Sequence, residues 1–132
     1  MMLYIIDSIR TNNFHGEQMM GKIRTLWENA SRKLEHHQNN VYGVYNDYES
    51  DYRGDYSLSI AMEENNGEAF IEITSSEKYK VFQVDKTDEQ GMFKTWSKIW
   101  KQEEIGLLER AYTYDFEKYG PNGEIEIHIG AV

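Results

Sequence analysis

Residues 109–132, ERAYTYDFEKYGPNGEIEIHIGAV, point to the fold most directly, because residues 40–62, NVYGVYNDYESDYRGDYSLSIAM, form a second version of them. Each copy has an aromatic segment, an acidic cluster, a turn and an alternating segment typical of a strand. The matched positions are Asp47, Tyr48 and Glu49 with Asp115, Phe116 and Glu117, and Leu58 and Ile60 with Ile127 and Ile129. We therefore expect two half-domains related by a pseudo-twofold axis, with a ligand cleft between them.

The helical segments that precede the two copies also match. In each, apolar residues recur every three or four positions, which predicts an amphipathic helix. The matched positions are Met19, Ile23, Leu26 and Trp27 with Met92, Trp96, Ile99 and Trp100. A repeat of this length is too long for a solenoid unit. We expect a single domain over residues 1–132, with internal repeats at about 1–64 and 65–132.

Composition excludes several classes of protein. The net charge of −9 argues against direct nucleic-acid binding, which needs a basic surface. The chain has no cysteine, which is compatible with a reducing compartment. Its apolar N-terminal run is too short for a signal peptide, and no segment reaches the ~20 apolar residues that a membrane span needs. These observations predict a cytoplasmic protein without membrane contact.

The remaining pattern gives the order of elements. The first strand is expected at Leu3–Arg10, a helix at about Glu17–Glu35, and a strand pair at Val41–Asn46 and Tyr56–Met62. In the second half, Thr87 and Gln90 fit a capping box before the second helix, and an aromatic strand is expected at Arg110–Phe116. Two copies of β-α-β-β predict an α+β domain, in which two helices cover a six-stranded, largely antiparallel sheet.

The chain resembles the GyrI-like effector-binding domains of AraC- and MerR-type transcription regulators, and in particular the integron-associated effector-binding group. The resemblance rests on residues 112–130, YTYDFEKYGPNGEIEIHIG, and on residues 41–60, VYGVYNDYESDYRGDYSLSI. It implies the duplicated fold and a cleft, lined by aromatic residues around a buried carboxylate, that binds hydrophobic and often cationic compounds. By motif position the carboxylate is Glu117, with Glu49 as its counterpart. It further implies that any role in transcription would need a protein partner.

The candidate ligand-binding residues are the two glutamates and seven aromatic residues. Strand alternation places Glu117 opposite its aromatic neighbours in the chain, so the rings around it would come from other strands, and the face that lines the cleft stays open. The helical tryptophans could equally pack in the core. The candidates are Glu117, Glu49, Tyr42, Tyr45, Tyr112, Tyr114, Phe116, Trp96 and Trp100.

The leading hypothesis is a small-molecule binding module without catalytic residues, cofactor or metal. The adjacent His36 and His37 point about 100° apart on a helix, which disfavours a metal site. One alternative is a hydrolase in which Glu117 acts as a general base. The other is a protein-interaction module of the gyrase-inhibitor type. The sequence favours binding, because no second acid, base or nucleophile has a distinctive spacing.

Overall fold

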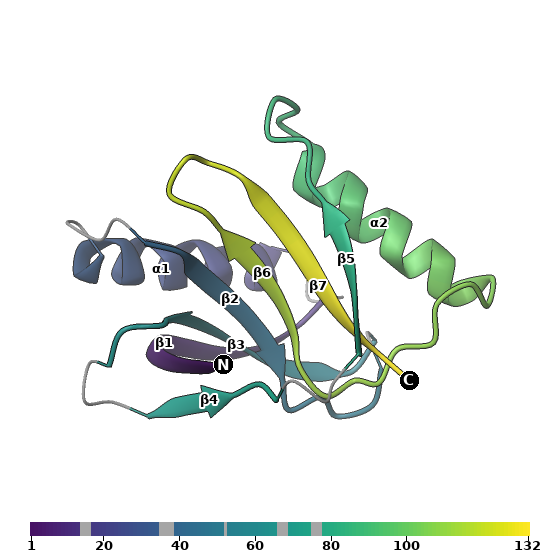
Figure 1. Ribbon diagram of the computed structural model, residues 1–132, viewed down its shortest axis with the longest axis horizontal. Helices are drawn as coiled ribbons and strands as arrows, with labels where there is room; N and C mark the ends of the chain where they lie inside the picture. The colour runs from purple at the N-terminus through teal and green to yellow at the C-terminus, as the bar shows by residue number, and fades with distance from the viewer. Residues whose placement is uncertain (14–16, 35–38, 52, 66–68, 75–77) are drawn as a thin grey trace.

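The structure is a computed structural model, and it describes residues 1–13, 17–34, 39–51, 53–65, 69–74 and 78–132. Within these ranges, two helices and seven strands follow one another in the order β-α-β-β-β-β-α-β-β (Figure 1). Their bounds are β1 Met2–Asn12, α1 Glu17–Lys33, β2 Val41–Asn46, β3 Asp55–Met62, β4 Phe70–Glu72, β5 Lys78–Gln83, α2 Gly91–Glu104, β6 Asp115–Tyr119 and β7 Ile125–Ala131.

The strands form one antiparallel sheet in the order β4-β1-β3-β2-β6-β7-β5. Outward from its centre, β2-β3-β1 on one side matches β6-β7-β5 on the other, so β2 and β6 meet at the seam between two equivalent halves. Figure 1 shows α1 on the side of the first half and α2 beside β5 and β7 of the second. The predicted α+β fold with duplicated halves is therefore confirmed. The seventh strand is the short β4, which extends the edge at β1.

Each helix packs its apolar stripe on its own half of the sheet. Leu26 and Ala30 of α1 pack with Tyr56, Leu58 and Ile60 of β3. In the second half, Ile99 of α2 packs with Ile127 and Ile129 of β7. The predicted helix correspondence holds in three dimensions, since its members Leu26 and Ile99 are both fully buried.

The other face of the sheet carries a third cluster of buried residues, around which the sheet curls. This cluster joins Leu3, Tyr42, Val44 and Phe116 with Ile71 and Ile73. Side chains alternate along a strand, so β2 and β6 each supply one set of residues to this cluster and the other set to the helix side.

Two predicted boundaries are wrong. The strand expected at Arg110–Phe116 begins only at Asp115, because Tyr112 has a left-handed backbone with φ of 55° that interrupts an extended chain. The capping box is absent as well. Thr87 donates its hydroxyl to Asp85 (2.6 Å), α2 begins later at Gly91, and its N-cap residue Gln90 makes no side-chain capping bond.

Replacing Ile99 with alanine should lower the free energy of unfolding by about 2–5 kcal/mol, because the substitution leaves a cavity between α2 and β7. Leu107→Ala is the matched control. Leu107 is 68% exposed, and its loss should change the free energy by less than about 0.5 kcal/mol. Urea denaturation followed by circular dichroism measures both values, and equal losses would contradict the packing described here.

Candidate functional site

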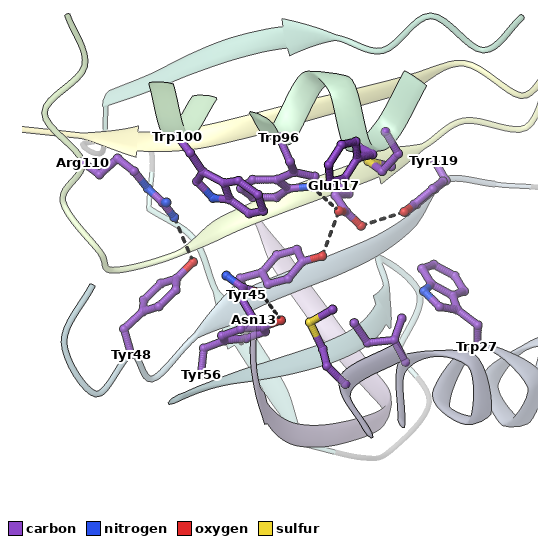
Figure 2. Close-up of a pocket in the computed structure, with 14 residues that line it drawn as sticks. Asn13, Trp27, Tyr45, Tyr48, Tyr56, Trp96, Trp100, Arg110, Glu117 and Tyr119 are labelled. Atoms are coloured by element: carbon purple, nitrogen blue, oxygen red, sulfur yellow. Dashed lines mark hydrogen bonds between the residues drawn. The ribbon is translucent and has the colours of Figure 1, made fainter. Parts of the chain in front are cut away.

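A pocket of about 310 Å³ lies on the helix side of the sheet, over the seam between β2 and β6. Both helices form its walls, and the strands β2, β3 and β6 form its floor (Figure 2). Its size is at the lower end of the range for small-molecule sites. The lining residues are Asn13, Met19, Ile23, Trp27, Tyr45, Tyr48, Tyr56, Met92, Phe93, Trp96, Trp100, Arg110, Glu117 and Tyr119.

The repeat explains why the two helices meet around this space. Three of the four matched helix positions line the pocket in both halves: Met19 and Met92, Ile23 and Trp96, and Trp27 and Trp100. The fourth position holds Leu26 and Ile99, which turn into the two cores. Each helix therefore attaches to its own half through one side of its apolar stripe and presents the other side to the pocket.

Glu117 on β6 is the buried carboxylate of the pocket, with only 4% of its surface exposed. Oε2 accepts hydrogen bonds from the Tyr45 hydroxyl and from the indole nitrogen of Trp96, both at 2.8 Å. Oε1 accepts one from the Tyr119 hydroxyl at 2.6 Å. Figure 2 shows these three donors converging on the carboxylate. They come from β2, α2 and β6, so both halves of the chain hold Glu117.

The surroundings of Glu117 set its protonation. Burial raises the pKa of its carboxyl above the usual range, and the hydrogen bonds from Tyr119, Trp96 and Tyr45 act in the opposite direction. Burial also raises the pKa of Tyr45 and of Tyr119, with a further contribution from the Glu117 charge. Both hydroxyls therefore keep their protons at neutral pH and remain hydrogen-bond donors to the carboxylate.

Gly43 provides the room for this carboxylate. It is the direct partner of Glu117 across the β2–β6 seam, and a Cβ atom at this position would lie 3.1 Å from Oε1. A larger side chain here would push the carboxylate out of place. Sequence reasoning missed Gly43, because its importance comes from the register of two strands that are distant in the sequence.

Aromatic rings cover much of the pocket wall. Trp96 and Trp100 lie with ring centroids 6.2 Å apart, and Tyr45 meets Trp96 edge-on at 5.3 Å. Tyr56 stands 5.5 Å from Tyr45 on the floor. At the other side, Trp27 meets Tyr119 edge-on at 5.0 Å. Such rings present flat π-surfaces to a ligand.

Four of the nine sequence candidates line the pocket, namely Glu117, Tyr45, Trp96 and Trp100. Tyr112 does not line the pocket, but its ring stacks on the lining residue Arg110 at 4.4 Å. Three candidates lie on the opposite face of the sheet: Tyr42 and Phe116 are buried in its cluster and Tyr114 packs against it. The sequence did not decide which face of the sheet lines the cleft. The structure shows that it is the face that carries Glu117.

Glu49 is not the structural counterpart of Glu117. It lies beyond the end of β2 and is exposed. Leu58 pairs with Tyr45, and the matched residue Ile127 pairs with Glu117, so Tyr45 occupies the position equivalent to Glu117. The sequence match had aligned two acidic-aromatic motifs without the register of the strands.

Several lining residues were not among the sequence candidates. Tyr119 follows Glu117 by two residues on one strand, so strand alternation could have identified it. Trp27 could have been found as the repeat partner of Trp100. Tyr48 could have been found in the same way, as the repeat partner of Phe116. Arg110 carried no such signal, because a loop brings it to the pocket. His36 and His37 lie outside the residues that the structure describes.

A family model for integron-associated effector-binding proteins, Cass2, matches residues 5–130. The chain belongs to the Cass2 family. It is similar to the crystal structure of integron cassette protein VCH_CASS2 from the mobile metagenome of Vibrio cholerae, with a TM-score of 0.76 and 28% sequence identity over 99% of this chain and 89% of that chain. No curated protein matches the sequence.

The match confirms the predicted resemblance to the integron-associated effector-binding group. Membership of an effector-binding family indicates that this Cass2-family protein binds small molecules. Across the described ranges, the helices include none with the length and hydropathy of a membrane span.

The raised pKa of Glu117 predicts an unusual pH dependence of stability. A carboxyl with a higher pKa in the folded than in the unfolded state stabilises the fold when protonated, and this contribution is lost as pH rises through the folded pKa. The melting temperature of the wild type, minus that of Glu117→Gln, should therefore fall as pH rises from about 4.3, the ordinary pKa of a glutamate, through the raised pKa of Glu117. Thermal unfolding in parallel buffers measures this difference, and a rising difference would contradict the burial penalty.

Proposed function

We propose that this protein binds lipophilic aromatic cations in the pocket between its halves, with Glu117 as the counter-ion. The observation that carries the proposal is the solvation of the Glu117 carboxylate by three neutral donors. Among the described residues, no Lys, Arg or His lies within ion-pair distance of it. A buried carboxylate without a cationic partner is costly, and a cationic ligand would supply the missing charge.

The aromatic wall supports the same ligand class. A cation over the face of an indole or phenol ring gains roughly 0.5–2 kcal/mol, and the gain grows as water is excluded. Trp96 both donates to Glu117 and forms part of the wall with Trp100, so a flat cation could meet the carboxylate and the rings together. Hydrophobic contact with Met19, Ile23 and Met92 would add to the affinity of a lipophilic compound.

Hydrolysis is a weaker reading of the same pocket. The raised pKa of Glu117 would suit a general base. However, both carboxylate oxygens already accept hydrogen bonds, and Oε2 accepts two. A base so engaged is less available to a water molecule, which favours binding over catalysis.

The charge of Glu117 is tested with an aromatic trimethylammonium ion and its neutral tert-butyl isostere. Isothermal titration calorimetry should show that the wild type prefers the cation, and that Glu117→Gln weakens cation binding by about tenfold or more while changing binding of the isostere little. Glu49→Gln is the matched control, because Glu49 is exposed and outside the pocket. Equal loss in both variants, or equal affinity for both ligands, would refute the proposal. Turnover of a neutral ester would favour hydrolysis instead.

The affinity for the same permanent cation should depend on pH. The ligand itself does not titrate, so the dissociation constant should rise as pH falls through the raised pKa of Glu117, because the protonated carboxyl no longer attracts a cation. Binding near that pKa should also release protons, which appears as a dependence of the measured heat on the ionisation enthalpy of the buffer. If the affinity of the wild type for this cation does not change with pH, Glu117 is not the counter-ion.

A further inference from the structure

The pocket contains a second buried charge, and the proposed function gives it no role. Arg110 lines the pocket, and its side chain is only 1% exposed. It is the one Lys, Arg or His among the lining residues that the structure describes. A guanidinium inside a pocket for cations needs an explanation, since like charges in a medium of low dielectric repel one another.

Arg110 is held from behind by an ion pair. Its Nη2 donates to Asp115 Oδ2 at 2.7 Å, and Asp115 in turn accepts the Tyr48 hydroxyl at 2.5 Å and the Gly130 amide at 2.8 Å. The Tyr112 ring stacks on the guanidinium at 4.4 Å. Asp115 is fully buried and does not line the pocket. The pocket is therefore in contact with the positive member of the pair.

The guanidinium also has unused donors. Nε and Nη1 of Arg110 are buried and have no hydrogen-bond acceptor within the described part of the chain. The carboxylate oxygen Oε1 of Glu103 lies 3.7 Å from Nη1, which makes an ion pair but is too long for a hydrogen bond. Buried donors in folded proteins nearly always have an acceptor, so a ligand that brings one to Arg110 would meet an unsatisfied demand.

The two charged groups lie at different ends of the pocket. Figure 2 shows Arg110 and Glu117 on opposite sides of the paired rings of Trp100 and Trp96. Trp96 interacts with both groups. Its indole nitrogen donates to Glu117, and its ring centroid lies 6.0 Å from the Arg110 guanidinium carbon. The site is thus polarised along the aromatic wall, with its anion at one end and its cation at the other.

We propose that the ligand is an aromatic monocation that carries a hydrogen-bond acceptor oxygen at the end opposite its positive charge, and that Arg110 selects for this oxygen. The inference rests on the proposed function and deepens it, because Glu117 takes the cationic end and Arg110 the acceptor end. Compounds with a cation at both ends are disfavoured, since their second charge would lie against the guanidinium.

The test uses rigid ligands that differ only at the far end. Trimethylammonium is fixed at one para position of a benzene and of a biphenyl frame, and the other para position carries hydrogen, carboxamide or a second trimethylammonium group. For the wild type, calorimetry should give dissociation constants about three- to tenfold lower for the carboxamide than for the hydrogen parent on at least one frame. The dication should bind more weakly than the parent.

A double variant locates the effect. Arg110→Met combined with Asp115→Asn removes both members of the ion pair, so no buried carboxylate is left unpaired. The ratio of parent to carboxamide dissociation constants should fall to about one. Arg110→Lys provides a second variant that keeps the charge and the ion pair but removes Nε and Nη1 as donors, and it should reduce the ratio as well.

The outcomes separate this inference from the proposed function. If no parent cation binds the wild type, both fail. If the parent binds and Glu117→Gln weakens it, but the far-end substituent has no effect on either frame or the dication binds most tightly, only the role of Arg110 fails. A carboxamide preference that survives in the folded double variant would also overturn it.

Discussion

The site depends on one constraint: a carboxylate is buried at the junction of two half-domains and is solvated there by the protein instead of by water. Glu117 draws its donors from β2, α2 and β6, which requires both halves to be in place. The seam register that pairs Gly43 with Glu117 leaves space for the group. Helix packing, strand order and pocket shape all serve to hold this arrangement.

The same constraint explains why a space exists between the helices. Each helix is anchored to its own half through Leu26 or Ile99, and nothing requires the two to pack closely over the seam. Their outer apolar residues therefore face one another across a pocket and do not fill a common core. Aromatic residues suit such positions because they bury a large area while keeping a flat face available. Trp96 thus has both of the roles considered from sequence, because it packs against the core around Ile99 and also lines the pocket.

Much of the fold could be predicted from the sequence, because it follows from local periodicity. The spacing of apolar residues located α1, β2 and β3 almost to the residue. Prediction failed where conformation depends on contacts between distant segments. The start of β6 was misplaced because Tyr112 adopts a left-handed backbone where Arg110 reaches Asp115. The candidate site shows the same division: Glu117 came from a motif, whereas Arg110 reaches the pocket through an irregular loop.

The register that makes Tyr45 the counterpart of Glu117 has a consequence for how such a site could arise. Two identical half-domains joined about a twofold axis would have the same residue at both of these positions, either two tyrosines or two glutamates. Neither arrangement pairs a glutamate with a tyrosine hydroxyl. In this chain the two copies differ at that position, so the tyrosine of one half donates to the glutamate of the other. Once symmetry is broken in this way, the two orientations of an unsymmetrical guest are no longer equivalent.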